Sequence, residues 1–272
     1  MTTTDTLRVP GATLHYEVSG AGPALLLIPG GPADSGVYAP IRSVLSDRYT
    51  VITYDPRGLS RSSLDGEPQD TTVQTFAQDV HELLAAINTD PAYVLGSSGG
   101  ALVGLELVTR YTEQVRALVA HEPPLKRLLA DADEHARFAR EVYDTYRSEG
   151  VGPAMGKFLA AAGLEQGASQ PPVDPPPEMA EAMARMQGNL DFFLGHMWLP
   201  LGGYTPDISR LRSLPITVAV GEASEGQLAY RTAVVLAERL GKEPTVFPGD
   251  HSGFLSHPET FARRLDEVLG TY

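Results

Sequence analysis

The sequence contains no cysteine, which excludes a disulfide framework, a thiolate metal site and a cysteine nucleophile. It has no run of five or more basic residues, and 34 Asp and Glu outnumber 21 Lys and Arg, for a formal charge of −13. Contacts with phosphate backbones need clustered positive charge, so we expect no nucleic-acid partner. No apolar run approaches the ~20 residues of a membrane span, and the N-terminus has neither the basic start nor the apolar stretch of a signal peptide. We therefore expect a cytoplasmic protein with no membrane partner.

What the sequence does have is an ordinary globular balance, with 42% hydrophobic and 20% charged residues in 272. Short apolar runs typical of buried strands alternate with segments of helical spacing in the first half of the chain. This rhythm predicts an α/β fold with a mostly parallel sheet, because parallel strands need crossover helices. The predicted strands are 12–18, 24–28, 49–54, 92–96 and 115–120, and the predicted helices are 72–88 and 101–111.

The rhythm stops after Pro123 and Pro124. Residues 125–206 show helical patterns and no strand run, and we interpret them as a helical lid inserted into the domain. The alternation then resumes with strands at 216–220 and 244–247 and helices at 228–240 and 258–269. The predicted organisation is therefore a core made of residues 1–124 and 207–272, interrupted by the lid.

Ser98 is the predicted nucleophile. It is the central residue of Gly96-Ser-Ser-Gly-Gly100, which lies directly between a predicted strand and a predicted helix. A sharp strand-to-helix turn of this kind lifts a serine hydroxyl out of the sheet, and the glycines allow the strand and the helix to approach closely. The alternative is a glycine-rich turn in which the serines only cap the helix.

Two further groups are expected beside Ser98. The turn Pro29-Gly-Gly-Pro32 follows a buried strand, and we predict that the N–H groups of Gly31 and Gly99 stabilise an oxyanion. Of the seven histidines, His251 follows the last predicted strand and is expected at the same edge of the sheet. We predict that His251 is the general base.

The acid that supports His251 is less clearly marked. The turn after strand 216–220 holds Ser224 at the position where a carboxylate is expected, and a neutral hydroxyl cannot stabilise an imidazolium. Glu122 ends the strand at 115–120, at the same edge of the sheet, and it is our preferred acid. The alternatives are Glu222, Glu225 and Asp250.

Across essentially its whole length, the sequence resembles the α/β-hydrolase superfamily. Within that superfamily, three segments resemble the zearalenone lactonases, serine hydrolases that open a resorcylic macrolactone: 96–101, 120–125 and 248–261. The resemblance implies that the acid is Glu122, at the same separation from the serine, 122 − 98 = 24 residues. It also implies oxyanion donors at Gly31 and Gly99 and a substrate-facing tryptophan in the lid, which matches Trp198.

We therefore predict a carboxylic ester or lactone hydrolase that needs no cofactor and no metal. Its partner would be a small apolar ester or lactone held by Phe192, Phe193 and Trp198, and the chain could form a homodimer. Two other hypotheses stay open. The same three residues could serve a peptidase or a C–C bond hydrolase, and the fold could serve as a receptor without catalysis.

Overall fold

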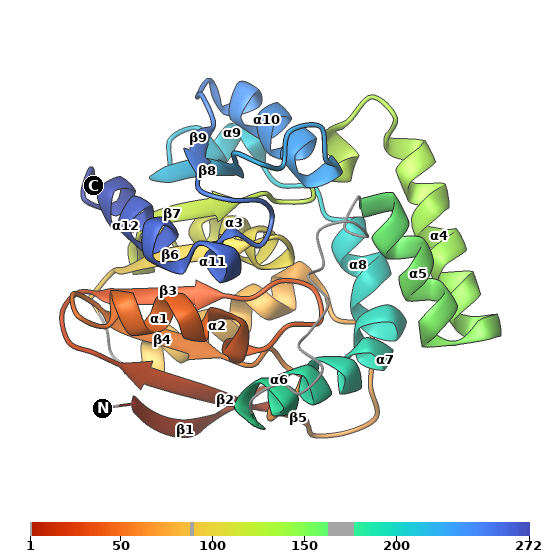
Figure 1. Cartoon of the computed structure of the whole chain (residues 1–272), viewed down its shortest axis with the longest axis horizontal. Coiled ribbons are helices and arrows are strands. Elements are labelled where there is room, and N and C mark those ends of the chain that lie inside the picture. The colour runs from red at the N-terminus through yellow and green to blue at the C-terminus, as the bar shows by residue number, and fades with distance from the viewer. Residues whose placement is uncertain (1, 88–89, 163–176) are drawn as a thin grey trace.

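The computed structural model describes residues 2–87, 90–162 and 177–272. Its strands form a sheet in the order β1-β2-β4-β3-β6-β7-β8-β9, with β5 paired to β2 (Figure 1). β2 is antiparallel to its neighbours β1, β4 and β5. The other neighbouring pairs, which join β4, β3, β6, β7, β8 and β9 in that order, are all parallel, and this confirms the predicted mostly parallel sheet. The strands are β1 (Thr2–Val9), β2 (Ala12–Ser19), β3 (Ala24–Ile28), β4 (Thr50–Tyr54), β5 (Ser63–Leu64), β6 (Ala92–Ser97), β7 (Val115–His121), β8 (Ile216–Gly221) and β9 (Thr245–Phe247).

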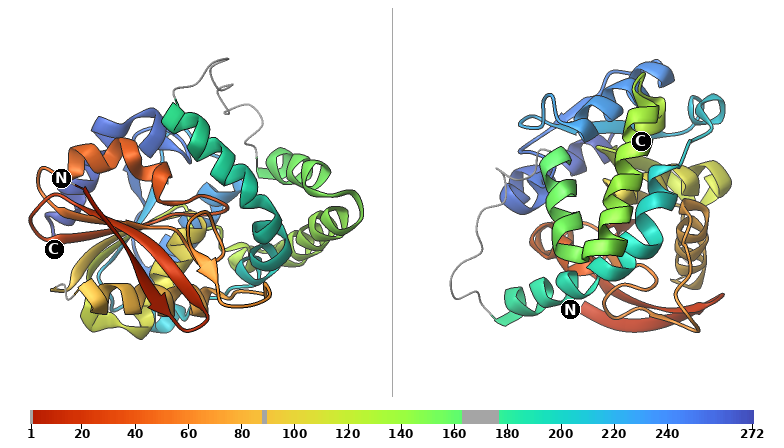
Figure 2. Two further views of the ribbon diagram at one scale, coloured as in Figure 1. Left: turned by 90° about the horizontal axis from the view of Figure 1, so that it is seen from below. Right: turned by 90° about the vertical axis from the view of Figure 1, so that its right-hand side faces the viewer.

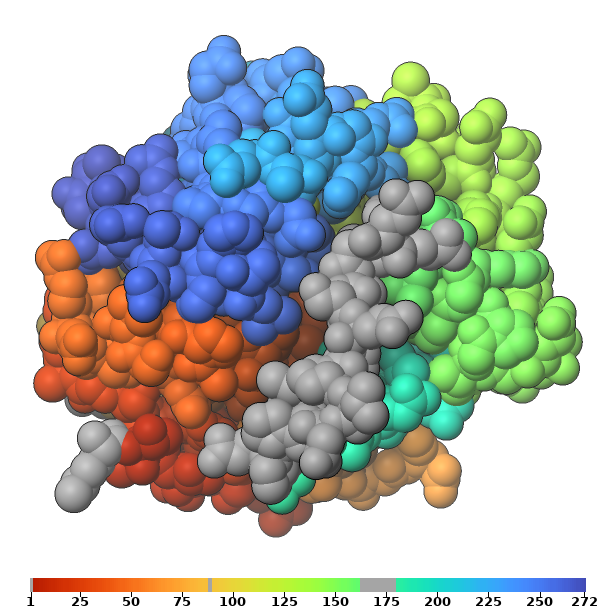
Figure 3. Space-filling view, in the orientation of Figure 1, coloured from red at the N-terminus to blue at the C-terminus, as the bar shows by residue number. Residues whose placement is uncertain are grey.

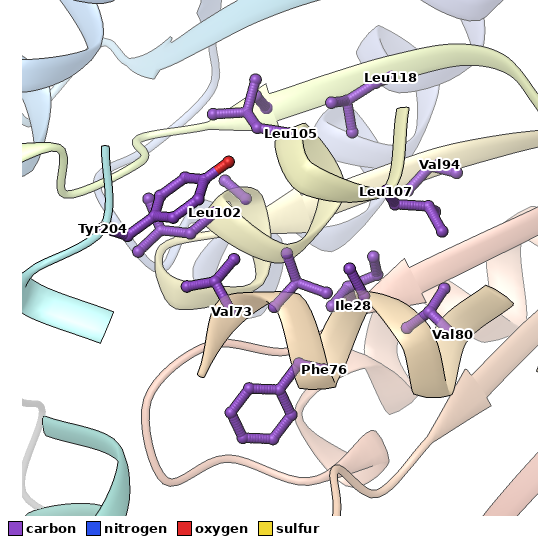
Figure 4. Packing of buried hydrophobic residues seen from close by; sticks show 14 of the residues in the cluster. Ile28, Val73, Phe76, Val80, Val94, Leu102, Leu105, Leu107, Leu118 and Tyr204 are labelled. Carbon is purple, nitrogen blue, oxygen red and sulfur yellow. The ribbon is translucent and has the colours of Figure 1, made fainter. Parts of the chain in front are cut away.

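Helices cover both faces of this sheet. They are α1 (Ala39–Leu45), α2 (Val73–Ile87), α3 (Gly99–Arg110), α10 (Leu228–Leu240), α11 (Gly253–Ser256) and α12 (Pro258–Leu269). Successive residues of β3 point to opposite faces, as the pleat of a strand requires. Leu26 and Ile28 belong to the buried cluster that includes residues of α2 and α3, and Figure 4 shows Ile28 beside Val80 of α2. Leu25 and Leu27 belong to the cluster on the other face, with residues of α1 and α12. A continuous apolar run is therefore the correct sequence for a strand that is buried on both sides.

Between β7 and β8 the described chain contains helices and turns but no strand, as predicted. We call residues 125–206 the helical insertion; of these, 163–176 lie outside the described residues. Its main helices are α4 (Ala132–Glu149), α5 (Val151–Ala162), α6 (Pro177–Gly188), α7 (Leu190–Phe192) and α8 (Trp198–Gly202), with a π-helical turn at Phe193–Met197, and α9 (Ile208–Leu211) follows it. Helices α4, α5, α7 and α8 lie beyond the end of the sheet toward which β3 points (Figures 1 and 2). None of the described helices is long and apolar enough to cross a membrane.

Some elements were not predicted. β1 pairs with β2 along its whole length, although six of its eight residues are exposed, from Thr2 to Thr6 and Arg8. The short helix α1 was also missed. The elbow helix α3 begins at Gly99, two residues earlier than predicted, and this places its first N–H groups next to Ser98.

Candidate active site

Ser98 occupies a strained turn between β6 and α3. Its φ is +56°, in the left-handed region that residues other than glycine rarely adopt. The turn is held because Ser98 N–H donates to the carbonyl of His121 (2.9 Å) and Ala101 N–H donates to the carbonyl of Ser98 (3.0 Å). Gly100 is required here, since a Cβ at this position would lie 2.1 Å from the carbonyl oxygen of Ile28. The fold therefore holds Ser98 in an unfavourable backbone conformation, as is common at functional sites.

Glu122 lies directly after β7 and also has a positive φ, +47°. Its side chain is fully buried. Glu122 Oε2 accepts a hydrogen bond from His251 Nδ1 (2.6 Å), and Oε1 accepts one from Gly221 N–H (2.9 Å). Both carboxylate oxygens are thus satisfied, one by the backbone of β8 and the other by the imidazole.

The hydrogen bonds of Glu122 also fix its charge. Burial by itself raises the pKa of the Glu122 carboxyl, but the hydrogen bonds from His251 and from the Gly221 N–H hold it below its ordinary value. An ionised carboxylate only accepts hydrogen bonds, so the proton of the His251 ring must be on Nδ1. His251 Nε2 is then left with a free lone pair, as a general base requires.

The other candidate acids lie elsewhere. Glu222 is exposed and accepts a hydrogen bond from Gly249 N–H (3.2 Å), and Asp250 accepts one from Ser252 N–H (2.8 Å). Glu225 is also exposed. Of the four carboxylates considered, only Glu122 forms a hydrogen bond with His251.

Ser98 and His251 line one cavity of about 630 Å³, together with Gly31 and Gly99. Within the described residues, the Ser98 hydroxyl forms no side-chain hydrogen bond, and His251 bonds only to Glu122. Hydrogen bonds between a nucleophile and its base are often long without substrate and shorten when it binds.

The two predicted oxyanion donors are close to each other. Gly31 follows β3 and has a φ of +58°, and Gly99 is the first residue of α3. A Cβ built on Gly99 would lie 3.3 Å from the backbone nitrogen of Gly31. The first N–H groups of a helix have no partner within the helix, so the N–H of Gly99 is available to a ligand.

Aromatic residues of the helical insertion form part of the cavity wall. Trp198 and Phe193 line the cavity with their ring centroids 6.1 Å apart, and Phe158 lies 5.2 Å from Trp198. The Trp198 indole is fixed because its Nε1–H donates to the carbonyl of Ala139 (2.8 Å). Phe192 is not among the lining residues. Its ring packs against Gly58 and lies 5.3 Å from His196, on another side of the same helical segment.

Charged residues that belong to no recognisable sequence motif also line this cavity. They are Lys126, Glu134, Glu225 and Arg231, with His135 beside them. Glu134, Glu225 and Arg231 are exposed, whereas Lys126 is half-buried. Arg231 of α10 lies 3.6 Å from Asp131, the residue before α4. The space-filling view shows the blue atoms of this part of the chain next to the yellow-green atoms of the insertion (Figure 3).

A fully buried histidine, His121, lies next to the candidate site and contacts Ser97 and the ring of His251. His121, the last residue of β7, has its Nδ1 3.1 Å from Ser97 Oγ, and its ring lies 6.3 Å from the ring of His251. Burial lowers the pKa of His121 to about 4, so this ring is neutral at pH 7. The sequence signal was its position, since it is the residue between a buried strand and the predicted acid.

Asn189 connects the helical insertion to the loop that carries Gly31. Its Nδ2 donates to the carbonyl of Pro32 (2.8 Å) and to Ser60 Oγ (2.9 Å), and its Oδ1 accepts from Ser60 N–H (2.6 Å). The side chain is buried. An ion pair between Arg185 and Asp34 (2.6 Å) lies nearby on the same connection. The insertion is therefore bonded to the residue that follows Gly31.

Comparison with known proteins identifies the family of this chain. Residues 23–182 match the model of the alpha/beta hydrolase fold. The chain belongs to the alpha/beta hydrolase family. This hydrolase is 35% identical to the hydrolase YraK of Bacillus subtilis, with 97% of this chain and 95% of the other covered.

A second relative of this hydrolase is the zearalenone hydrolase of Bionectria ochroleuca, at 27% identity over 98% of both chains. Among solved structures, a thermophilic esterase from Thermogutta terrifontis is similar in fold, with a TM-score of 0.77 and 21% identity, covering 100% of this chain and 98% of the other. The family relation confirms the predicted fold class, the resemblance to zearalenone hydrolases and the assignment as a hydrolase.

Proposed function

We propose that this hydrolase cleaves a carboxylic ester or lactone through an acyl-enzyme on Ser98. The observation that carries the proposal is the 2.6 Å hydrogen bond between buried Glu122 and His251. His251 in turn lines the same cavity as Ser98. A histidine oriented by a carboxylate beside a serine on a strained turn is the arrangement that activates a weak nucleophile.

In the first half of the reaction, Ser98 Oγ attacks the carbonyl carbon while His251 Nε2 takes the hydroxyl proton. Glu122 stabilises the imidazolium that forms and does not itself take the proton. The carbonyl oxygen becomes an oxyanion, which the N–H groups of Gly31 and Gly99 stabilise by about 3–4 kcal/mol each in comparable sites. The bond to the alkoxy oxygen then breaks, and His251 gives its proton to the leaving alcohol.

In the second half, water replaces the alcohol. His251 Nε2 takes a proton from the water, whose oxygen bonds to the acyl carbon, and the bond from that carbon to Ser98 Oγ breaks. The proton returns to Ser98, and the carboxylic acid leaves. With a lactone, the alcohol and the acid are parts of one product, so the ring opens.

The cavity wall supports an apolar substrate. Trp198, Phe193 and Phe158 present aromatic surface held in place by the Trp198 hydrogen bond to Ala139. Burial of an apolar group against such a wall contributes about 25 cal/mol per Å² of area removed from water. We expect the acyl or alkoxy part of the substrate to be largely apolar.

A fluorophosphonate label tests the nucleophile, because it reacts only with an activated serine. We expect one covalent adduct per chain, located by mass spectrometry on Ser98, with no labelling of Ser98→Ala. Parallel turnover of 4-nitrophenyl esters, lactones, 4-nitroanilides and C–C diones ranks the bond types. Labelling at another residue, or equal labelling of Ser98→Ala, would overturn the proposal, and turnover of anilides alone would indicate a peptidase.

A further inference from the structure

Lys126 is a positive charge inside the proposed substrate cavity. It follows the paired prolines after β7, where its backbone N–H donates to the carbonyl of Pro124 (2.8 Å). The side chain is half-buried and lines the same cavity as Ser98. Its Nζ lies 4.4 Å from the centroid of the Trp198 ring.

Within the described residues, Lys126 Nζ has no carboxylate oxygen within 4 Å and no hydrogen-bond acceptor. The remaining charged groups of the lining do not compensate it, because Glu134 and Glu225 are exposed to solvent. Arg231, the second lining cation, is exposed and already lies near Asp131 (3.6 Å). Among the described residues, Lys126 is thus the one lysine, arginine or carboxylate of this lining that is half-buried and not exposed.

The surroundings of this ammonium leave it free to take an anionic partner. The aromatic face of Trp198 attracts a cation, but it carries no net charge to balance. A charged group taken out of water is costly unless it is paired and hydrogen-bonded. Burial lowers the pKa of Lys126 to about 8, so the group remains mainly protonated at pH 7 and retains its donors.

We propose that Lys126 is a subsite for a carboxylate carried by the substrate, so that the preferred ester or lactone has an apolar body and one acidic group. The apolar body would lie on Trp198 and Phe193, and the carboxylate would accept hydrogen bonds from Lys126 Nζ. A single ammonium matches a single negative charge. This inference rests on the proposed function only in treating the ligand as a substrate, because the subsite can bind a carboxylate whether or not the protein is catalytic.

Binding can be measured directly, because Trp198 is the only tryptophan of the chain and lies against Lys126. Fluorescence titrations in the Ser98→Ala background would compare 5-phenylpentanoate with 5-phenylpentanamide, which have the same shape and differ in charge. We expect the carboxylate to bind about 10- to 100-fold more tightly, the range for a hydrogen bond to a charged group. Lys126→Met should abolish this preference and Lys126→Arg should retain most of it.

Arg231→Met is the matched control, because it removes the exposed cation of the same lining. It should change the preference less than twofold. If the acid and the amide bind equally to the parent, if the acid does not bind, or if the preference survives in Lys126→Met, the subsite proposal is wrong. An equal loss of the preference for the acid in Arg231→Met would likewise overturn the proposal, because it would show that the carboxylate responds to the overall positive charge of the cavity and not to Lys126 in particular.

A pH series on the parent protein tests the subsite even if Lys126→Met does not fold. The preference for the acid should decline between pH 7 and pH 9.5, as Lys126 loses its proton near pH 8. Other titratable or charged groups facing the cavity are Glu134 and His135 of α4, Glu225 before α10, Arg231 in α10, and His251. Their influence is monitored by the amide, whose affinity should change little. A preference that is unchanged at pH 9.5 would contradict the proposal.

A kinetic comparison separates this inference from the proposed function. The substrates are mono-4-nitrophenyl glutarate, which has a terminal carboxylate, and 4-nitrophenyl pentanoate, which does not. Lys126→Met should lower kcat/KM for the acidic ester about 10- to 100-fold more than it lowers kcat/KM for the neutral ester. If neither ester is cleaved and Ser98 is not labelled, the proposed function fails, and the fluorescence titrations still decide on the subsite.

Discussion

The substitution Glu122→Gln separates the charge of this side chain from its shape. In the native site, Oε1 must accept from Gly221 N–H, so a glutamine would keep its oxygen on that side. Its NH2 group would then face His251 Nδ1. Because an NH2 donates, Nδ1 would have to accept, and the ring proton would move to Nε2. In that tautomer His251 cannot take the proton of Ser98.

The expected cost follows from this change of tautomer. The loss of the buried carboxylate should lower kcat/KM about 10⁴-fold, the effect of the equivalent change in a well-studied serine protease, or about 5 kcal/mol of transition-state stabilisation. Two matched variants at the alternative positions should cost far less. Ser224→Ala removes a buried hydroxyl that has no hydrogen-bond partner among the described residues, and Glu222→Gln changes an exposed side chain.

The assay is steady-state hydrolysis of a 4-nitrophenyl ester by the parent and the three variants. Circular dichroism and thermal melting check that each variant is folded, and mass spectrometry after fluorophosphonate treatment counts reactive sites. Glu122→Gln should still fold, because the hydrogen bond to Gly221 N–H can be retained. A loss smaller than tenfold in Glu122→Gln, or a larger loss in Glu222→Gln or Ser224→Ala, would refute the assignment of the acid.

Two further predictions concern residues that support the site. Asn189→Ala should lower kcat about 10- to 100-fold with little change in KM, because the hydrogen bond to Pro32, directly after Gly31, and the two hydrogen bonds to Ser60 are lost and the proposed oxyanion donor shifts; a variant that loses stability but keeps kcat would contradict a positioning role. His121 should make the protein less stable in acid, because the unfolded chain takes up its proton below about pH 6.5 whereas the folded chain does so only near pH 4. The free energy of unfolding should thus fall by about 3 kcal/mol as the pH is lowered across this interval. Glu122, whose folded-state pKa is lowered, acts in the same direction but only below about pH 4.5. Urea denaturation at several pH values would give a flatter profile for His121→Asn, and equal slopes in both proteins would contradict this account.

The sequence was informative about the ends of the parallel strands. Ser98, Glu122 and His251 could be placed at one edge because the carboxyl ends of parallel strands meet there, and the structure joins Glu122 to His251 as expected. β1 could not be predicted, because a threonine-rich, exposed edge strand lacks the apolar alternation that marks a buried face. Its order comes from pairing with β2, which is a tertiary contact.

The insertion was the least predictable part of the site. Phe192 and Phe193 are neighbours in the sequence, yet only Phe193 lines the cavity. Successive residues of a helix point about 100° apart, so the orientation of the segment decides which ring faces inward. Lys126 and Asn189 were not predicted for a different reason. A single lysine or asparagine belongs to no sequence pattern, so nothing in the sequence indicates which residues it contacts in the folded protein.

The Asn189 contacts have a practical consequence for engineering this enzyme toward new substrates. Exchanging the whole insertion for that of a relative is an attractive route to altered selectivity, but it would also remove the Asn189 hydrogen bond to the loop that carries Gly31, the proposed oxyanion donor. Chimeras that keep an asparagine in register with Pro32 and Ser60 should remain active, and those that omit it should bind their new substrates and turn them over slowly. We therefore expect selectivity and turnover to be coupled through one amide side chain, and libraries should keep asparagine at that position.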